Sequence, residues 1–197
     1  MNAFLALDAS TDTLSAALFV DGALRASASK TVPPRTPGTL LALVPPLLES
    51  AGLDFADLGL GFAIGRGPGS YAGLRTCVST VNGWALPFRH PVWAVPSPFA
   101  SAAAFFAEHP AAAACRVTGR ARRDTAWFAR FRRSPEGWPA LEGAFDLCPA
   151  VPPPEADVAD APPSAEWIGR LRLAGLPADV PLPLYLHPAV ATPPKYA

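Results

Sequence analysis

Ile64-Gly65-Arg66-Gly67-Pro68-Gly69-Ser70-Tyr71-Ala72-Gly73-Leu74-Arg75 is the most informative segment of this chain. It follows an apolar run at residues 60–64 and precedes a helical pattern that begins near residue 71. Glycine permits positive φ and close approach of another main chain, whereas proline fixes φ and removes a donor. Between a strand and a helix, such a loop directs backbone N–H groups and the helix dipole at one place. The segment therefore predicts either an anion cradle or a tight packing turn.

The rest of the sequence predicts alternating strands and helices. Strands are expected at residues 3–8, 14–20, 23–30, 60–64, 91–95, 114–118 and 125–132, and helices at 39–51, 71–86, 97–107 and 165–174. Asp21-Gly22 is a hairpin signal between the second and third strands. Pro45-Pro46 lies inside the first helix, where we expect a bend or a restart because a mid-helix proline costs about 3 kcal/mol or more. Residues 149–163 should form a loop, and the tail at 181–197 should be extended.

Composition narrows the class of protein. The chain has 197 residues, half of them hydrophobic, and a formal net charge of zero, so its overall charge gives no reason to bind nucleic acid. Its three cysteines show no CxxC spacing, and His90, His109 and His187 show no metal-ligand spacing. No apolar run reaches the roughly 20 residues that cross a bilayer, and no leader is recognisable at the N-terminus. We therefore expect a cytoplasmic protein with reduced cysteines, no metal and no membrane contact.

Three motifs point to one family. The residues Gly67-Pro68-Gly69-Ser70-Tyr71-Ala72-Gly73-Leu74-Arg75 resemble the GPGS(F/Y)(T/A)GLR signature of bacterial TsaB, also called YeaZ. Leu5-Ala6-Leu7-Asp8-Ala9-Ser10-Thr11 resembles the LAIDTST opening of that family, and residues 117–133 resemble its DARRGEVY-type hairpin. The resemblance is good over residues 1–135 and weak beyond them.

The resemblance implies both fold and role. The fold would be α/β and actin-like (ribonuclease H-like), with a mixed five-stranded sheet and helices in residues 1–98 and a smaller degenerate α/β domain in residues 99–197. TsaB is the non-catalytic partner of TsaD in forming threonylcarbamoyladenosine at position 37 of tRNA, together with the ATPase TsaE. We thus expect a TsaD homologue as main partner, a TsaE homologue, a homodimer when the chain is alone, and tRNA contact only through the complex. No catalytic residue or cofactor is expected in this chain alone, and ATP would enter only in the complex.

The expected interface lies on two helices with apolar residues on more than one side, because an uncovered apolar side marks a partner site. The residues expected to bind the partner are Leu40, Val44, Leu47, Tyr71, Leu74, Arg75 and Val78. On this interpretation, Leu74→Glu or Val78→Glu would break association without unfolding the chain. In residues 34–38 the chain has no His, although TsaD carries a helical metal-binding His pair there and TsaB usually has an Arg-x-His-Ser pattern.

Two other functions stay open. Asp8, Ser10 and Thr11 follow the first strand, where actin-like ATPases hold a metal and phosphate. They could keep a residual nucleotide contact, or Asp8 could simply accept hydrogen bonds from its own turn, and the former would suit a small ATPase or sugar-kinase-like enzyme. Seven arginines stand in residues 116–133 beside Trp127, Phe128 and Phe131. This hairpin would suit a tRNA-binding module, or it is merely solvated.

Overall fold

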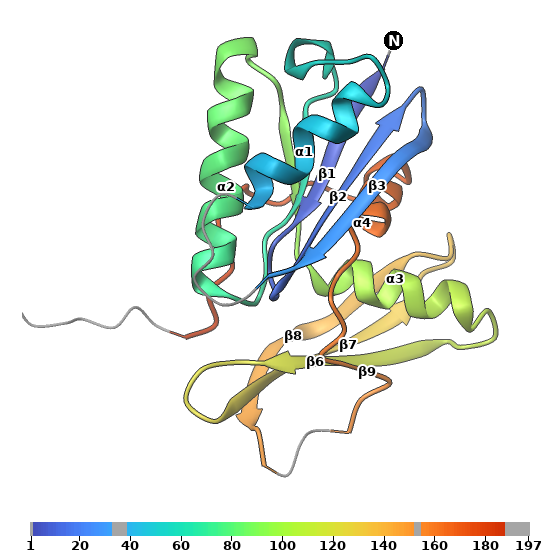
Figure 1. The fold of residues 1–197 in the computed structure, drawn as a ribbon. Helices are drawn as coiled ribbons and strands as arrows, with labels where there is room; N and C mark the ends of the chain where they lie inside the picture. The colour runs from blue at the N-terminus through green and yellow to red at the C-terminus, as the bar shows by residue number, and fades with distance from the viewer. Residues whose placement is uncertain (1, 33–38, 152–154, 188–197) are drawn as a thin grey trace, which may run out of the picture.

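The computed structural model describes residues 2–32, 39–151 and 155–187, and its elements form two sheets with helices around them (Figure 1). The first sheet has the order β3-β2-β1-β4-β5 and the second the order β8-β7-β6-β9. The strands of the first sheet are β1 (Ala3–Asp8), β2 (Thr13–Val20), β3 (Ala23–Thr31), β4 (Phe62–Gly65) and β5 (Val92–Val95). Those of the second are β6 (Ala114–Arg120), β7 (Thr125–Arg133), β8 (Pro139–Pro149) and β9 (Val158–Ala159).

The first sheet is mixed, as the sequence predicts. β1 pairs antiparallel with β2, and β2 with β3, whereas β1–β4 and β4–β5 are parallel. Asp21 and Gly22 both have positive φ, which matches the hairpin turn expected between β2 and β3. The central strand β1 is buried along its whole length because helices cover both faces, and its residues are therefore apolar without alternation until Asp8.

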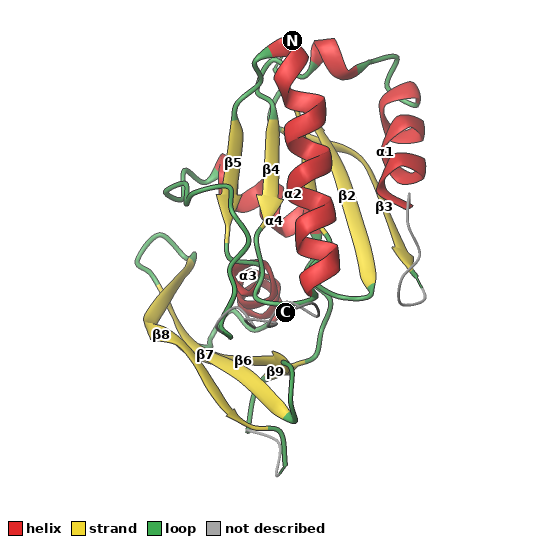
Figure 2. Ribbon diagram, turned by 90° about the vertical axis from the view of Figure 1, so that its left-hand side faces the viewer, coloured by secondary structure: helices red, strands yellow, loops and turns green. Residues whose placement is uncertain are grey.

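Helices cover both faces of the first sheet (Figure 2). α1 (Thr39–Glu49) and α2 (Tyr71–Ala85) pack on one face, where Leu5 and Leu7 of β1 point. α4 (Ala165–Leu173) packs on the other, where Phe4 stacks on Phe19 with ring centroids 4.9 Å apart. Short 3-10 turns at Phe55–Asp57 and Leu86–Phe88 complete this half. The strand order and the helices on both faces are those of the actin-like, ribonuclease H-like fold.

The second sheet carries one helix, α3 (Pro98–Glu108), which packs on the face lined by Cys115, Val117 and Phe131. This is the smaller, degenerate α/β part expected from the sequence. α4 follows the second sheet in sequence but is tied to the first, since Ser15 Oγ accepts the Ala165 N–H at 3.0 Å. The division of the chain after residue 98 stays a prediction. No helix among the described residues is long and apolar enough to cross a membrane.

Three local details differ from what the sequence predicts. α1 continues through Pro45 and Pro46 without a restart, and its Val44 and Leu47 are held in the core on either side; a bend there stays a prediction. β8 was not expected, and β9 lies within residues expected to be a loop. The alternation of Leu141, Phe145 and Leu147 with polar residues is a strand signal, but Gly143, with φ of 78°, interrupts it.

Candidate functional site: a cleft and a helix face

The glycine-rich loop joins β4 to α2 and packs against the turn that follows β1. The Ser70 N–H donates to the Ser10 carbonyl at 2.7 Å, and a Cβ atom on Gly69 would clash with that same carbonyl oxygen. A Cβ atom on Gly73, in the first turn of α2, would clash with the Ala9 carbonyl oxygen. Two of the glycines are therefore required because two main chains touch.

The N–H groups of this loop are largely used inside the protein. Arg66 N–H donates to the Val95 carbonyl at 2.9 Å, Gly67 N–H to Ser97 Oγ at 2.9 Å, and Gly73 N–H to Ser70 Oγ at 3.2 Å. Ser70 thereby caps the N-terminus of α2. These contacts match the interpretation of the loop as a tight packing turn, and an anion cradle formed by its remaining N–H groups stays a prediction.

Asp8, at the end of β1, is fully buried. Its Oδ1 atom accepts the Ser10 N–H at 2.7 Å and the Ser10 hydroxyl at 2.6 Å. Burial raises the pKa of Asp8 above its ordinary value, and the hydrogen bonds from Ser10 offset part of that rise. The geometry matches the interpretation in which Asp8 holds its own turn. Contact of Asp8, Ser10 or Thr11 with a nucleotide stays a prediction.

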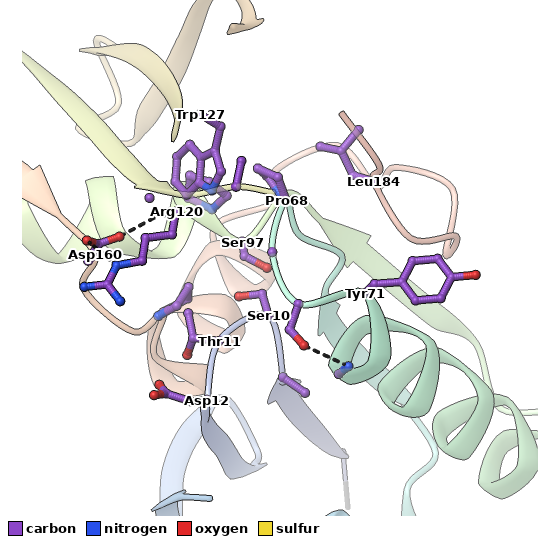
Figure 3. Close-up of a pocket in the computed structure, with 18 of the residues that line it drawn as sticks. Ser10, Thr11, Asp12, Pro68, Tyr71, Ser97, Arg120, Trp127, Asp160 and Leu184 are labelled. Atoms are coloured by element: carbon purple, nitrogen blue, oxygen red, sulfur yellow. Dashed lines mark hydrogen bonds and ion pairs between the residues drawn. The ribbon is translucent and has the colours of Figure 1, made fainter. Parts of the chain in front are cut away.

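A cavity of about 650 Å³ lies between the two sheets (Figure 3). The turn after β1 supplies Ser10 and Thr11, the N-terminal ends of α2 and α3 supply Ser70 and Ser97, and β7 supplies Trp127. Asp8 is not part of its lining. Arg120 at the rim pairs with Asp160 at 3.4 Å, so its charge is already balanced. No group of three His, Cys, Asp or Glu residues within the described ranges could hold a metal ion.

The expected interface residues divide into two sets. Leu40, Val44, Leu47, Leu74 and Val78 are buried, at 7% exposure or less. All but Leu74 belong to the core cluster on the first sheet, and Leu74 lies beside Gly67 of the glycine-rich loop. Tyr71 is 49% exposed, and Arg75 is exposed beside it. A partner can reach only the second set directly, so the expectation that a Glu at Leu74 or Val78 would leave the fold intact is wrong. Residues 34–38, which lack the family's His, lie outside the described residues.

The outer face of α2 bears small polar groups beyond Arg75. Thr76, Ser79, Asn82 and Gly83 are exposed there, and their spacing places them on one strip along the helix. The buried stripe of Leu74, Cys77, Val78, Val81 and Ala85 faces inward.

The three cysteines of the chain form no disulfide.

Three of the seven arginines between residues 116 and 133 have partners within the protein. Arg116 pairs with Glu155 at 3.1 Å and Arg120 with Asp160. Arg133 donates to the carbonyls of Phe106 and His109, both at 2.8 Å, and so closes the C-terminal end of α3. Arg133 is thus part of the fold, whereas the Arg120 side chain stays 90% exposed beside Asp160, and binding of nucleic acid by this segment stays a prediction.

The sequence analysis missed one part of the site entirely. Residues 179–187 run from the edge of β5 across the glycine-rich loop to β7, and Leu184 and Tyr185 line the cavity. The Leu184 N–H donates to the Arg66 carbonyl at 2.7 Å. The prolines in this tail indicate an extended chain but not its destination, because the contacts that fix it are long-range.

Comparisons with known proteins support the family that the sequence motifs indicate. A family model described as TsaD, tRNA N6-adenosine threonylcarbamoyltransferase, matches residues 38–147, more than half of the chain. A search among curated proteins finds no match. A solved structure of an uncharacterized protein with similarity to peptidase YeaZ from Pseudomonas aeruginosa has a TM-score of 0.78 and 27% identity, and the match covers 95% of this chain and 100% of that chain. YeaZ from Pseudomonas aeruginosa has a TM-score of 0.76 and 28% identity, with 94% and 100% covered. The chain therefore belongs to the TsaD family and, within it, to the YeaZ, or TsaB, proteins.

Proposed function

We propose that this chain is the non-catalytic partner of a TsaD homologue in forming N6-threonylcarbamoyladenosine at position 37 of tRNA. The observation that carries the proposal is its likeness to YeaZ along almost the whole of both chains. A likeness that extends through both sheets indicates a shared assembly role more strongly than a local motif would. In the complex, a TsaE homologue is the third protein, and nucleotide and tRNA meet this chain only there.

The lack of a catalytic role is supported by how the chemical groups near the cleft are used. Asp8 is buried against Ser10, outside the cavity lining. In the loop after β4, the N–H groups of Arg66, Gly67, Ser70 and Gly73 donate to acceptors inside the protein. These contacts stabilise the fold and support a structural role for the loop.

The interface is proposed to follow the outer face of α2. A partner helix can approach closely along Thr76, Ser79 and Gly83 because their side chains are short, and the distance between packed helices depends on the side chains at the contact. The same face would join two copies of the chain when the TsaD homologue is absent. The buried residues Leu74 and Val78 support this face from beneath.

The test is complex formation with the TsaD homologue of the same organism, measured by size-exclusion chromatography with light scattering. The wild-type chain should form a stable mixed complex that replaces any homodimer. Ser79→Arg should abolish it, because a long charged side chain would stand in the middle of the α2 face. Ser29→Arg is the matched control, since Ser29 is exposed on β3, near Ser164 and Glu166 and away from α2. Equal binding by the two variants, with unchanged circular dichroism, would exclude α2 as the interface.

A further inference from the structure

The segment 179–187, here called the strap, touches both halves of the molecule. At its start, the Asp179 N–H donates to the Ala94 carbonyl of β5 at 2.9 Å. At its end, His187 Nε2 lies 3.1 Å from the Thr125 hydroxyl of β7, and Leu186 packs on the core of the second sheet. The strap therefore follows a fixed path over the glycine-rich loop.

Arg66 holds the middle of the strap. Its Nε donates to the Leu182 carbonyl at 2.8 Å, its guanidinium pairs with Asp179, and its own carbonyl accepts the Leu184 N–H at 2.7 Å. The Arg66 side chain is 12% exposed, whereas the side chain of its partner Asp179 is 41% exposed, so the contacts lie at the surface with the guanidinium itself mostly covered. Charge-assisted hydrogen bonds in such a setting are stronger than those between neutral groups, and they order the chain they hold.

The strap places Tyr185 on the first turn of α2. The rings of Tyr185 and Tyr71 stack with centroids 5.1 Å apart, and they remain 44% and 49% exposed. Arg75 lies beside Tyr71, one turn further along α2. Its guanidinium carbon is 5.3 Å from the Tyr71 ring centroid, and its Nη1 donates to the Tyr71 hydroxyl at 2.6 Å. Two segments distant in sequence thus build one exposed cluster of two aromatic rings and a cation.

We infer that the strap is part of the partner-binding surface, and that Tyr71, Arg75 and Tyr185 form its main contact for a surface of the TsaD homologue that presents a carboxylate beside an apolar side chain. The inference rests on the proposed function and adds to it a segment outside α1 and α2. It assigns to Arg66, which does not touch the partner, the role of positioning Tyr185.

The cluster has the composition of a strong contact. Tyrosine and arginine are enriched at the residues that dominate binding energies, and a cluster already ordered by the fold loses little entropy on binding. Arg75 makes no ion pair with any carboxylate in the described part of the chain, and its printed side-chain contacts are with Tyr71. Its exposed guanidinium can therefore pair with a carboxylate from the partner.

The position of the cluster also fits. Tyr71 and Arg75 are one turn apart on the helix and continue into the exposed strip at Ser79. A partner helix along that strip would end at the strap. The cluster is thus continuous with the interface proposed above, and the strap would set where the partner helix stops.

The experiment measures the dissociation constant of the full chain for the TsaD homologue by isothermal titration calorimetry. Tyr185→Ala and Arg75→Glu should each weaken binding by about tenfold or more, as expected for a dominant contact residue. Val180→Ala is the matched control, because Val180 is 55% exposed on the same strap but is not part of the cluster, and it should stay within about twofold of wild type. Arg66→Ala should weaken binding as well and should raise hydrogen exchange in residues 179–187.

The outcomes distinguish a failure of the strap inference from a failure of the proposed function. Wild-type binding with unchanged affinity in Tyr185→Ala and Arg75→Glu would overturn the strap inference and leave the proposed function standing. Tighter binding by Tyr185→Ala would also overturn it, since the strap would then cover the surface and not extend it. No binding by the wild-type chain would overturn both. If Arg66→Ala fails to fold, the two exposed variants still test the inference, because neither replaces a buried side chain.

Discussion

Asp8 Oδ1 accepts two hydrogen bonds from Ser10, one from its N–H at 2.7 Å and one from its hydroxyl at 2.6 Å. This pair closes the turn after β1, on which the glycine-rich loop rests. The second oxygen of Asp8 is buried and has no hydrogen-bond partner among the described residues. The carboxylate therefore stabilises the turn through one oxygen and pays a desolvation cost at the other.

The first prediction concerns pH. Because burial raises the pKa of Asp8 in the folded state above that in the unfolded state, the folded state binds the proton more tightly. Its contribution to stability is greatest below the unfolded pKa and declines as pH rises through the folded pKa. Asp8→Asn keeps one acceptor for Ser10 and does not ionise, so it should gain stability relative to wild type as pH rises above the unfolded pKa of about 4. Urea unfolding across that range measures the difference, and a gain by the wild type with rising pH would contradict the assignment.

The second prediction compares two glycines of one helix. Gly73→Ala should destabilise the protein by about 1–3 kcal/mol, because its Cβ would meet the Ala9 carbonyl oxygen and the main chains would have to separate. Gly83→Ala places a Cβ in open space on the same helix and should stabilise by roughly 0.5–1 kcal/mol. The free energies of unfolding of the two variants, measured in urea, should differ in sign. Equal effects would mean that α2 and the turn after β1 are further apart than described.

The third prediction concerns the buried stripe of α2. Leu74 is fully buried beside Gly67, and Leu74→Ala should cost about 2–5 kcal/mol because it leaves a cavity under the glycine-rich loop. Leu74→Glu should abolish folding, since a buried carboxylate there has no partner. Thr76→Ala, on the exposed side of the same turn, should stay within about 0.5 kcal/mol of wild type. Thermal unfolding followed by circular dichroism would contradict this if Leu74→Glu kept a cooperative transition.

The first sheet could be predicted because its signals are local. β1 to β3 and the Asp21-Gly22 turn follow from hydrophobic runs and turn residues that lie next to one another in sequence. α1 shows the opposite case, since Pro45 and Pro46 lower its intrinsic propensity and burial of Val44 and Leu47 overrides it. Helix periodicity also predicted that α2 has an apolar side. It did not show whether that side faces the sheet or a partner.

The site needed the structure because its parts come together over long distances. The pairing of Tyr71 with Tyr185 joins residues 114 positions apart, and Arg66 with Asp179 joins residues 113 positions apart. A proline-rich tail gives no periodic pattern from which such contacts could be derived. The arginines of the hairpin were similarly ambiguous, since their sequence does not reveal that Glu155 and Asp160 lie beside them.

The last prediction separates structural from solvated arginines in that hairpin. Arg133 donates to the carbonyls of Phe106, His109 and Ala112 at 2.8–3.0 Å and lies 4.6 Å from the Phe106 ring centroid. Arg133→Gln should therefore destabilise the protein by about 1–3 kcal/mol, because carbonyls at the end of α3 would lose their donor. Arg132→Gln, at an exposed position next to it, should change stability by less than about 0.5 kcal/mol. If this hairpin binds tRNA, Arg132→Gln should also weaken the affinity of the isolated chain for tRNA at low salt. Filter binding measures that affinity and so distinguishes a tRNA-binding arginine from a merely solvated one. Unchanged stability in Arg133→Gln would show that the end of α3 does not depend on this side chain.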